Sequence, residues 1–465
     1  MVADDLRRIG IPLTMAIAVA VAVFTARPYA GSWNDGSRLA TVESLVDRRT
    51  FVIDESIYVV TPAPVTPGSA PPYAPGDALL ADHGTKDKML VGGHFYSDKS
   101  PVPAVLMAGV YQLWRWVGGP AAAERPEGFA RGLTLIFASG PFILAVWCVR
   151  RIVRRVGVPT PWDVWLVASF ALGSVALPYA QHVNNHILLL AVAALAADLI
   201  VWPDAPSAGR AAGLGCLAGL AYTIDLGAGP PLALALGGWI VWQCRRVLPV
   251  AMFGLAAVPW LVLHHLLNYQ IAGSLGPANG NPEFFRWPGS PFDESNMTGH
   301  WAHASGGKAG LYALDLLFGK KGFLMYTPPM LLALAVLPRL LRRPLAERPA
   351  LVALWAWAAG TWLLYAATSR NLSGACLTVR WFVPLLVPGY VALAVMVREF
   401  PAYRVDLAVL AAGGFAIGGE GVIRGPWTGN VPYVYWPAAG LALIAWGIVA
   451  ARRSLARGRQ TRVLP

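Results

Sequence analysis

Two polar stretches, WNDGSRLATVESLVDRR at residues 33–49 and TKDKMLVGGHFYSDKSP at residues 85–101, interrupt a chain that is otherwise mostly apolar. Both carry carboxylates and basic side chains, and both follow a first apolar segment at residues 11–27. A charged loop that follows a membrane helix can bring a water-soluble reaction centre close to a substrate carried in the lipid. We therefore predict that this charged loop carries a functional site.

The composition is typical of integral membrane proteins, because 56% of the residues are hydrophobic, only 13% are charged and the mean hydropathy is +0.51. Apolar runs long enough to cross about 30 Å of hydrocarbon recur throughout, so residues 1–465 are expected to form a single transmembrane domain. The net charge of +12 comes from arginines that flank these runs, as cytoplasmic anchors do, and we expect no nucleic-acid partner. The four cysteines lack the spacing of a zinc site.

Hydropathy and charge together predict an all-α polytopic bundle of about 12 transmembrane helices, with a range of 11–13. If the N-terminus lies inside, the arginine clusters, such as those at residues 150–155 and 339–348, also lie inside. The predicted spans are residues 11–27, 130–149, 162–181, 186–202, 210–225, 228–243, 248–267, 322–338, 350–368, 379–397, 405–422 and 432–450.

The segment at residues 102–118 could be a further span, but crossing the membrane there would place the arginines of residues 150–155 outside. It is short and carries Arg115 between two tryptophans, so we interpret it as a juxtamembrane helix. Residues 28–128 then form a large first extracytoplasmic region, and residues 268–321 form a second one. All six lysines lie in these two regions.

Within the first region, GSRLATVESLV at residues 36–46 has helical spacing, with Asp35 and Ser37 as capping candidates. Such a helix would hold Asp35 near its N-terminus. Residues 61–76 contain six prolines and should be irregular, as either a mobile cover or a passive surface loop. Residues 1–30 could instead be a cleaved signal peptide, but cleavage would disturb the charge alternation.

Several short motifs occur in a defined order: an Asp after the first span, an external amphipathic stretch, the Lys-x-Pro of SDKSP with Lys99 and Pro101, a juxtamembrane helix, and Arg131 opening the next span. This series resembles the C-type glycosyltransferase (GT-C) superfamily, in particular relatives of protein O-mannosyltransferases and of lipid A aminoarabinose transferases. The resemblance covers residues 1 to about 200, and beyond them rests on helix count and a second external loop. It implies a GT-C-type bundle and a sugar donor carried on a polyprenyl phosphate.

The resemblance assigns the catalytic role to Asp35. Many relatives have an acidic pair there, whereas this chain has Asn34, Asp35 and Gly36, so one carboxylate is missing. Asp87 and Asp98 are the candidates to replace it. The chemistry agrees, because attack of an acceptor hydroxyl on an anomeric carbon needs a group that takes the proton, which a partly desolvated Asp35 could do. The alternative role for Asp35 is a helix cap.

The leaving phosphate needs cations that stabilise its developing charge. The predicted donor-phosphate ligands are Lys99, Arg131, Lys320, Lys321 and Arg380, with Lys88 as a further candidate. Each could instead be an ordinary interfacial anchor. No nucleotide-binding fingerprint is present, and a lipid-linked donor requires none.

Polar side chains also gather where predicted spans emerge on the outer side, in PYAQHVNNHI at residues 178–187 and at YTIDLG. Lipid would not tolerate such groups, so we expect them to line a cavity. His182 and His186 have metal-ligand spacing, but no HExxH glutamate accompanies them, and we predict neither a metal nor another cofactor. The predicted cavity or sugar-binding residues are Asp87, His94, Asp98, His182, Asn184, Asn185, His186 and Asp225.

These features predict an integral membrane hexosyl- or pentosyltransferase that moves a sugar from a polyprenyl-phosphate donor to an acceptor hydroxyl at the extracytoplasmic face, with inversion. The expected location is the bacterial inner or plasma membrane. The expected partners are the donor, membrane lipids and an acceptor that could be a protein, a lipid or a glycan. Two alternatives stay open: a glycan polymerase or ligase that uses lipid-linked chains, and a lipid-linked sugar flippase or transporter. A flippase should carry polar residues deep inside its spans, where only Asp198 is a candidate.

Overall fold

The computed structural model describes residues 2–461, except residues 203, 245, 294–296 and 432. Each of the predicted spans contains a helix, which confirms the all-α bundle. The bundle helices are α1 (Val2–Thr25), α5 (Pro126–Thr134), α6 (Gly140–Val156), α7 (Trp162–Leu172), α8 (Ala176–Tyr179), α9 (Asn185–Ile200), α10 (Ala208–Ile224), α11 (Gly229–Gln243), α12 (Val247–Ala272), α13 (Gly306–Phe318), α14 (Phe323–Tyr326), α15 (Pro329–Arg342), α16 (Arg348–Thr368), α17 (Leu386–Glu399), α18 (Arg404–Arg424) and α19 (Tyr435–Thr461).

The lengths and burial of these helices identify a multi-pass membrane protein. Within the described residues, seven helical segments are long and apolar enough to cross a membrane. An eighth is counted if α13–α14 and α15, which meet at a bend of 105°, form one span. The segment Arg380–Glu399 is 94% buried and lies at the centre, whereas the apolar windows of α12 and α19 are only 11% buried. Because α12 and α19 expose most of their apolar surface, we assign them to the lipid-facing rim.

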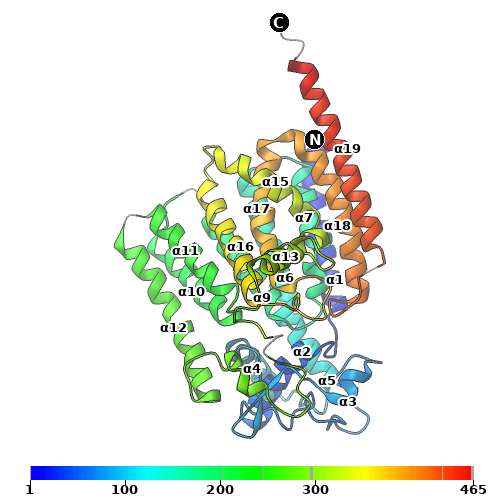
Figure 1. Cartoon of the computed structure of the whole chain (residues 1–465), viewed down its shortest axis with the longest axis vertical. Helices are drawn as coiled ribbons and strands as arrows, with labels where there is room; N and C mark the ends of the chain where they lie inside the picture. The colour runs from blue at the N-terminus through cyan, green and yellow to red at the C-terminus, as the bar shows by residue number, and fades with distance from the viewer. Residues whose placement is uncertain (1, 203, 245, 294–296, 432, 462–465) are drawn as a thin grey trace.

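A smaller lobe lies below the bundle in Figure 1 and is formed by the predicted first external region. Its elements are α2 (Trp33–Glu43), α3 (Ala78–His83), the antiparallel strands β1 (Lys88–Val91) and β2 (His94–Ser97), and α4 (Pro101–Trp116). The lobe has its own hydrophobic core, in which Leu39 of α2 belongs with Met107 and Tyr111 of α4. Helix α4 is the expected juxtamembrane helix, and it packs on α2 and against the ends of α10 and α12.

The proline-rich residues 61–76 are irregular, as predicted. They are nevertheless tied to the lobe, because the Tyr73 hydroxyl donates to the Ile57 carbonyl at 3.0 Å and the Thr66 amide donates to the Ala123 carbonyl at 2.8 Å. The Ala30 amide also donates to the Pro72 carbonyl, which holds the segment beside the start of α2.

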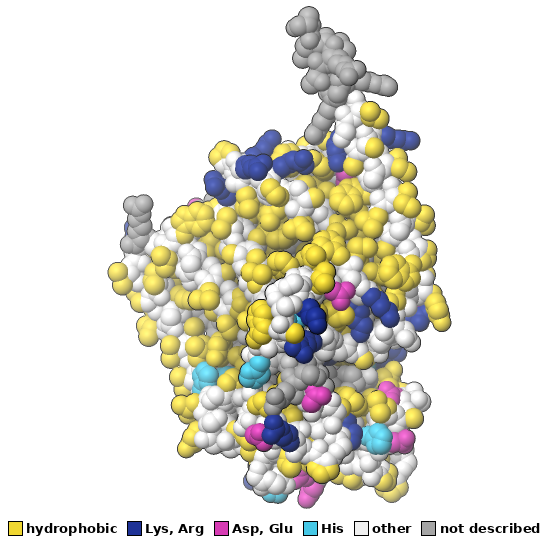
Figure 2. All heavy atoms as spheres, viewed as in Figure 1, with side chains coloured by type: hydrophobic (Ala, Val, Ile, Leu, Met, Phe, Trp, Pro, Cys, Tyr) yellow, Lys and Arg dark blue, Asp and Glu magenta, His cyan; other side chains and the backbone are white. Residues whose placement is uncertain are grey.

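Charge is distributed unevenly along the long axis of the molecule. Figure 2 shows Lys and Arg side chains along the upper edge of the bundle, a yellow apolar middle, and a mixture of acidic, basic and histidine side chains on the lower lobe. Basic side chains therefore gather at the end of the bundle opposite the lobe.

Candidate active site

Asp35 lies in the first turn of α2, as predicted, but the helix is capped by a different residue. Ser32 is the N-cap, and its hydroxyl oxygen accepts from the Asn34 amide at 3.1 Å. The predicted capping by Ser37 is wrong, because Ser37 lies inside the helix, where its hydroxyl donates to the Asp87 carbonyl at 2.5 Å. A helix start at Trp33 therefore places Asp35 in the first turn of α2, where the positive end of the helix dipole favours a carboxylate.

The carboxylate of Asp35 is enclosed and held by several donors. Its Oδ1 accepts from the Ser32 hydroxyl at 2.5 Å, and its Oδ2 accepts from the Gly31 amide at 2.8 Å. The Nδ1 atom of His182 lies 3.0 Å from Oδ2, at an angle unsuited to a hydrogen bond. Asp35 is only 1% exposed and His182 only 4% exposed, so this acid and this imidazole form a buried pair.

The β1–β2 hairpin brings two further predicted residues together around Lys99. Lys88 pairs with Ser97, so Asp87 and Asp98 flank the open end of the hairpin. The Lys99 ammonium lies 2.6 Å from an Asp87 oxygen and 2.8 Å from an Asp98 oxygen. Burial raises the pKa of Asp98, and the ammonium of Lys99 opposes that rise. The positive charge of Lys99 is therefore already balanced by two carboxylates.

Arg38 is a central residue of the site that the sequence analysis did not single out. It lies one turn after Asp35 on α2 and is 4% exposed. Its Nε has no hydrogen-bond partner, and its guanidinium makes no ion pair within the described residues. Burial, together with the nearby Arg380, lowers the pKa of Arg38 to about 10, and Asp98 opposes this shift. The i, i+3 spacing from Asp35 was the signal that could have identified it.

Arg380 is the second guanidinium of the site, and it lies in the turn that precedes α17. Its Nε is buried without a partner, like that of Arg38, and the guanidinium lies over the Trp427 ring at 5.5 Å from the centroid. Trp427, from the loop between α18 and α19, also contacts the His182 ring at a centroid distance of 6.1 Å. No local sequence pattern marks Trp427, because its position relative to Arg380 depends on how distant helices pack.

The polar residues at the start of α9 are buried at the same end of the bundle. Asn184 caps α9 by accepting from the Ile187 amide at 3.0 Å. The Asn185 side-chain Nδ2 donates to Asp225 Oδ2 at 3.1 Å, and the His186 Nδ1 lies 3.8 Å from the same oxygen. Asp225 in turn accepts from the Tyr365 hydroxyl at 2.6 Å. These contacts tie α9 to α10 and α16.

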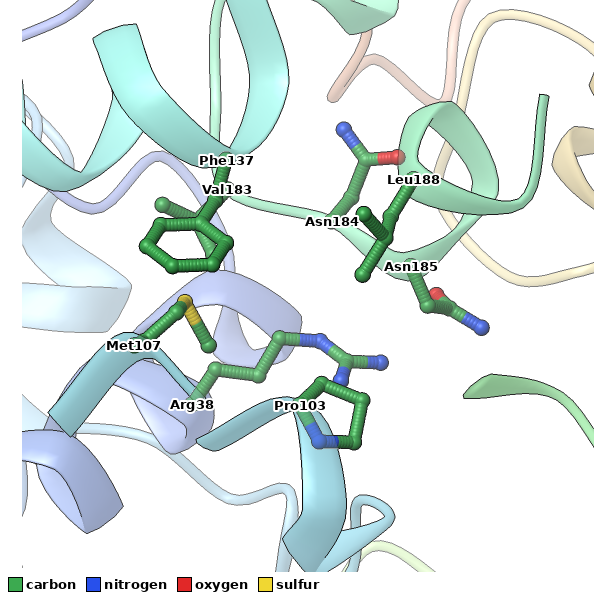
Figure 3. A pocket seen from close by; sticks show the side chains of 8 residues that line it. All are labelled: Arg38, Pro103, Met107, Phe137, Val183, Asn184, Asn185 and Leu188. Atoms are coloured by element: carbon green, nitrogen blue, oxygen red, sulfur yellow. The ribbon is translucent and has the colours of Figure 1, made fainter. Parts of the chain in front are cut away.

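A small pocket opens between the lobe and the start of α9. Figure 3 shows the Arg38 side chain extending across this pocket, with its guanidinium between Pro103 and Leu188. Pro103 and Met107 come from the lobe helix α4, whereas Asn185 and Leu188 come from α9. The pocket is lined by Arg38, Pro103, Met107, Phe137, Val183, Asn184, Asn185 and Leu188.

The other predicted ligands lie in different surroundings. The Lys321 ammonium donates to the Gly374 carbonyl at 2.7 Å, and the Lys321 carbonyl accepts from the Val379 amide next to Arg380. Lys320 and Arg131 are exposed. His94 is exposed as well, and its Nδ1 pairs with Asp54 at 2.7 Å, away from the buried group.

Among the described residues, no cluster of three or more His, Cys, Asp and Glu side chains could hold a metal ion. The expectation that the reaction uses no metal or other cofactor stays a prediction.

No protein-family model and no curated protein matches the sequence. Among solved structures, the chain is similar to ArnT from Cupriavidus metallidurans, a lipid A aminoarabinose transferase whose crystal structure contains undecaprenyl phosphate. The identity is 13% and the TM-score 0.50, over 94% of this chain and 75% of ArnT. It is also similar to the Archaeoglobus fulgidus oligosaccharyltransferase in its apo form, with 14% identity and a TM-score of 0.43, over 96% of this chain and 56% of that one. The similarity to ArnT shows that the chain has the fold of the GT-C superfamily, as the motif order implied.

Proposed function

We propose that this protein is a membrane glycosyltransferase that moves a sugar from a polyprenyl phosphate to an acceptor hydroxyl at the lobe end of the bundle. The observation that carries this proposal is that Arg38, which is 4% exposed, and the half-buried Arg380 near it lack carboxylate partners within the described residues. Arg38 also lies one turn after Asp35 on α2. A buried guanidinium without an anion is costly, so such a site favours an anionic ligand.

A lipid phosphate fits the position of these two arginines. The ArnT structure was solved with undecaprenyl phosphate, and this chain has the same fold. A phosphate bound beside Arg38, on the side of the pocket nearer Arg380, would give both guanidinium groups the acceptor oxygens that they lack. Guanidinium groups suit phosphate geometry because they donate two parallel hydrogen bonds. The adjacent apolar lining from Pro103, Met107 and Leu188 would accept the first carbons of the lipid.

The reaction that suits this arrangement is a single displacement. The acceptor hydroxyl loses its proton to the buried Asp35–His182 group as its oxygen bonds to the anomeric carbon. The bond between that carbon and the phosphate oxygen breaks, and the electron pair stays on the phosphate, where Arg38 and Arg380 stabilise the charge. One displacement inverts the configuration of the anomeric carbon.

The remaining assignments follow from this mechanism. Lys99 and Lys321 would assist the arginines, and Lys320 and Arg131 would contact the donor phosphate or neighbouring lipid headgroups from the exposed side. Asp87, Asp98, Asn185, His186 and Asp225 would shape the sugar cavity, and His94 would act at its outer edge. The lobe would face the extracytoplasmic side of a bacterial inner membrane. The sugar would be a hexose or a pentose, and the acceptor a protein, a lipid or a glycan.

The direct test is transfer of a labelled sugar from polyprenyl phosphate by the purified protein, run beside a flipping assay in liposomes. Asp35→Asn should abolish transfer while it leaves donor binding intact, and Asp82→Asn on the exposed face of α3 is the matched control. If the wild type flips the donor without any transfer, and Asp35→Asn flips equally well, the protein is a flippase and the transferase proposal is wrong.

A further inference from the structure

The His182 imidazole lies between Asp35 on one side and Trp427, which the Arg380 guanidinium covers, on the other. Its Nδ1 is enclosed and lies 3.0 Å from Asp35 Oδ2, without hydrogen-bond alignment. The ring contacts Tyr29 at a centroid distance of 6.0 Å and Trp427 at 6.1 Å, and Trp427 in turn lies under the Arg380 guanidinium. An imidazole at this place can reach both the carboxylate and a substrate bound by the arginines.

The local backbone is arranged so that the imidazole can come this close. A Cβ atom on Gly31 would lie 2.5 Å from His182 Cε1 and 2.9 Å from Trp427 Cδ1, so no larger residue fits there without moving the ring. The Gly31 amide also donates to Asp35, and the Asn184 side chain donates to the His182 carbonyl at 2.8 Å. Both the ring and its acidic neighbour are therefore held in place by residues from separate segments.

The two ring nitrogens have different surroundings. Nδ1 is buried against Asp35, whereas Nε2 makes no hydrogen bond with any described residue and keeps access to solvent. The side chain of His182 retains 5% of its exposure, and the following residues Val183 and Asn184 line the pocket. A carboxylate at Nδ1 favours the tautomer with its proton on Nδ1, which leaves a free lone pair on Nε2.

Resting on the proposed function, we infer that His182 is the general base of the reaction and that Asp35 is a positioning residue that acts through it. The acceptor hydroxyl gives its proton to His182 Nε2 while its oxygen bonds to the anomeric carbon. The electron pair of the broken carbon–oxygen bond stays on the lipid phosphate, and the imidazolium is stabilised by Asp35 until it releases its proton to water. A small tilt of the ring aligns the Nδ1 proton with Oδ2, since 3.0 Å is already hydrogen-bonding distance.

This assignment agrees with the coordination of Asp35. The carboxylate is 1% exposed, and the Ser32 hydroxyl and the Gly31 amide already donate to its two oxygens. An acceptor hydroxyl would reach the accessible Nε2 of His182 more easily than the enclosed carboxylate. The competing role for His182 is structural, as a residue that only fixes the turn before α9.

The test is His182→Ala, with His83→Ala on the exposed surface of α3 as the control. We expect kcat for transfer to fall by about 10²- to 10⁴-fold, with the dissociation constant for polyprenyl phosphate unchanged. Added imidazole should restore part of kcat in His182→Ala but not in Asp35→Asn, because imidazole can replace a lost base but cannot repair a lost carboxylate. A structural role would give no such rescue.

A second variant protects the test against a folding defect. Gly31→Ala leaves both functional side chains in the sequence but displaces the imidazole, so kcat should fall while donor binding stays normal. Near-normal kcat in His182→Ala, or equal failure with and without imidazole in a variant that still binds donor, would overturn the assignment and leave the transferase proposal standing. Absence of transfer by the wild type would overturn both.

Discussion

The two ends of the bundle differ in whether their arginines have carboxylate partners. At the basic end, each of three buried carboxylates has an arginine partner: Asp198 pairs with Arg155, Glu347 with Arg398, and Asp406 with Arg453. Arg398 illustrates the pattern, since its two terminal nitrogens donate to both oxygens of Glu347, at 2.7 and 3.0 Å. This pair joins the start of α16 to α17, and the other two join α6 to α9 and α18 to α19, so their role is to hold the helices together.

At the lobe end, Arg38 is buried and Arg380 is half-buried, and both lack a carboxylate partner among the residues that the structure describes. Removing a charge from water without compensation costs several kcal/mol in order of magnitude. The arginines of the basic end therefore stabilise the fold, whereas those of the lobe end reduce stability and require another explanation. An anionic ligand supplies one.

The largest expected effect concerns the basic end. Arg398→Met should lower the free energy of unfolding by about 3–5 kcal/mol, because it leaves Glu347 buried without its partner. Thermal unfolding of the purified protein measures this loss. Donor binding by the folded fraction should stay normal, and a loss of stability below about 1 kcal/mol would contradict the structural role of the pair.

The same substitution at the lobe end should have the opposite signature. Arg38→Met should weaken the binding of polyprenyl phosphate by about 100-fold, since one of the two guanidinium contacts is lost. Its thermal stability should equal or exceed that of the wild type, because a buried unpaired charge has been removed. Equilibrium binding and thermal unfolding check the two parts, with Arg125→Met as the exposed control. A destabilised Arg38→Met variant with normal donor binding would show that Arg38 stabilises the fold, as the arginines of the basic end do, and does not bind the donor.

The pH dependence of donor binding gives a smaller effect with a defined sign. Burial lowers the pKa of Arg38 to about 10, so the free protein loses this charge as the pH rises through that value, whereas a bound phosphate favours the charged form. Affinity for polyprenyl phosphate should therefore be flat below about pH 9 and fall roughly tenfold per pH unit above about pH 10. The fall should disappear in Arg38→Met. An identical slope in that variant would assign the titration to another group.

The smallest effect is expected at Lys99. Because Asp87 and Asp98 already balance its charge, Lys99→Gln should weaken donor binding only about 3- to 10-fold, far less than Arg38→Met. Titration with polyprenyl phosphate compares the two variants directly. If Lys99→Gln caused the larger loss, the ammonium would have to leave its carboxylates on binding, and Lys99 would replace Arg38 as the principal ligand.

Much of the fold could be predicted from the sequence, because apolar length and the position of arginines are local signals. The interpretation of residues 102–118 as a juxtamembrane helix depended only on these signals, and the structure has a helix there that packs in the lobe. The placement of Asp35 near the start of a helix was predicted in the same way. The helix boundary was missed by a few residues, since Ser32 was not recognised as the cap.

The site was less predictable, because its residues come together through packing between distant segments. Lys99 was predicted to be a donor-phosphate ligand, and the sequence did not show that the hairpin places Asp87 and Asp98 on either side of it, because that arrangement depends on strand register. Arg38 was read only as part of a helix. No local pattern marks an arginine as unpaired, since the absence of a partner is a property of the whole fold.

The bare backbone at Gly31 has a consequence for natural variation. A single methyl group there would collide with the imidazole, so the residue at position 31 constrains which residue can occupy position 182. Homologues that retain histidine at the second position should keep glycine at the first, and those that acquire alanine or serine should have exchanged the ring for something smaller. An alignment of homologous sequences would show whether the residues at positions 31 and 182 change together.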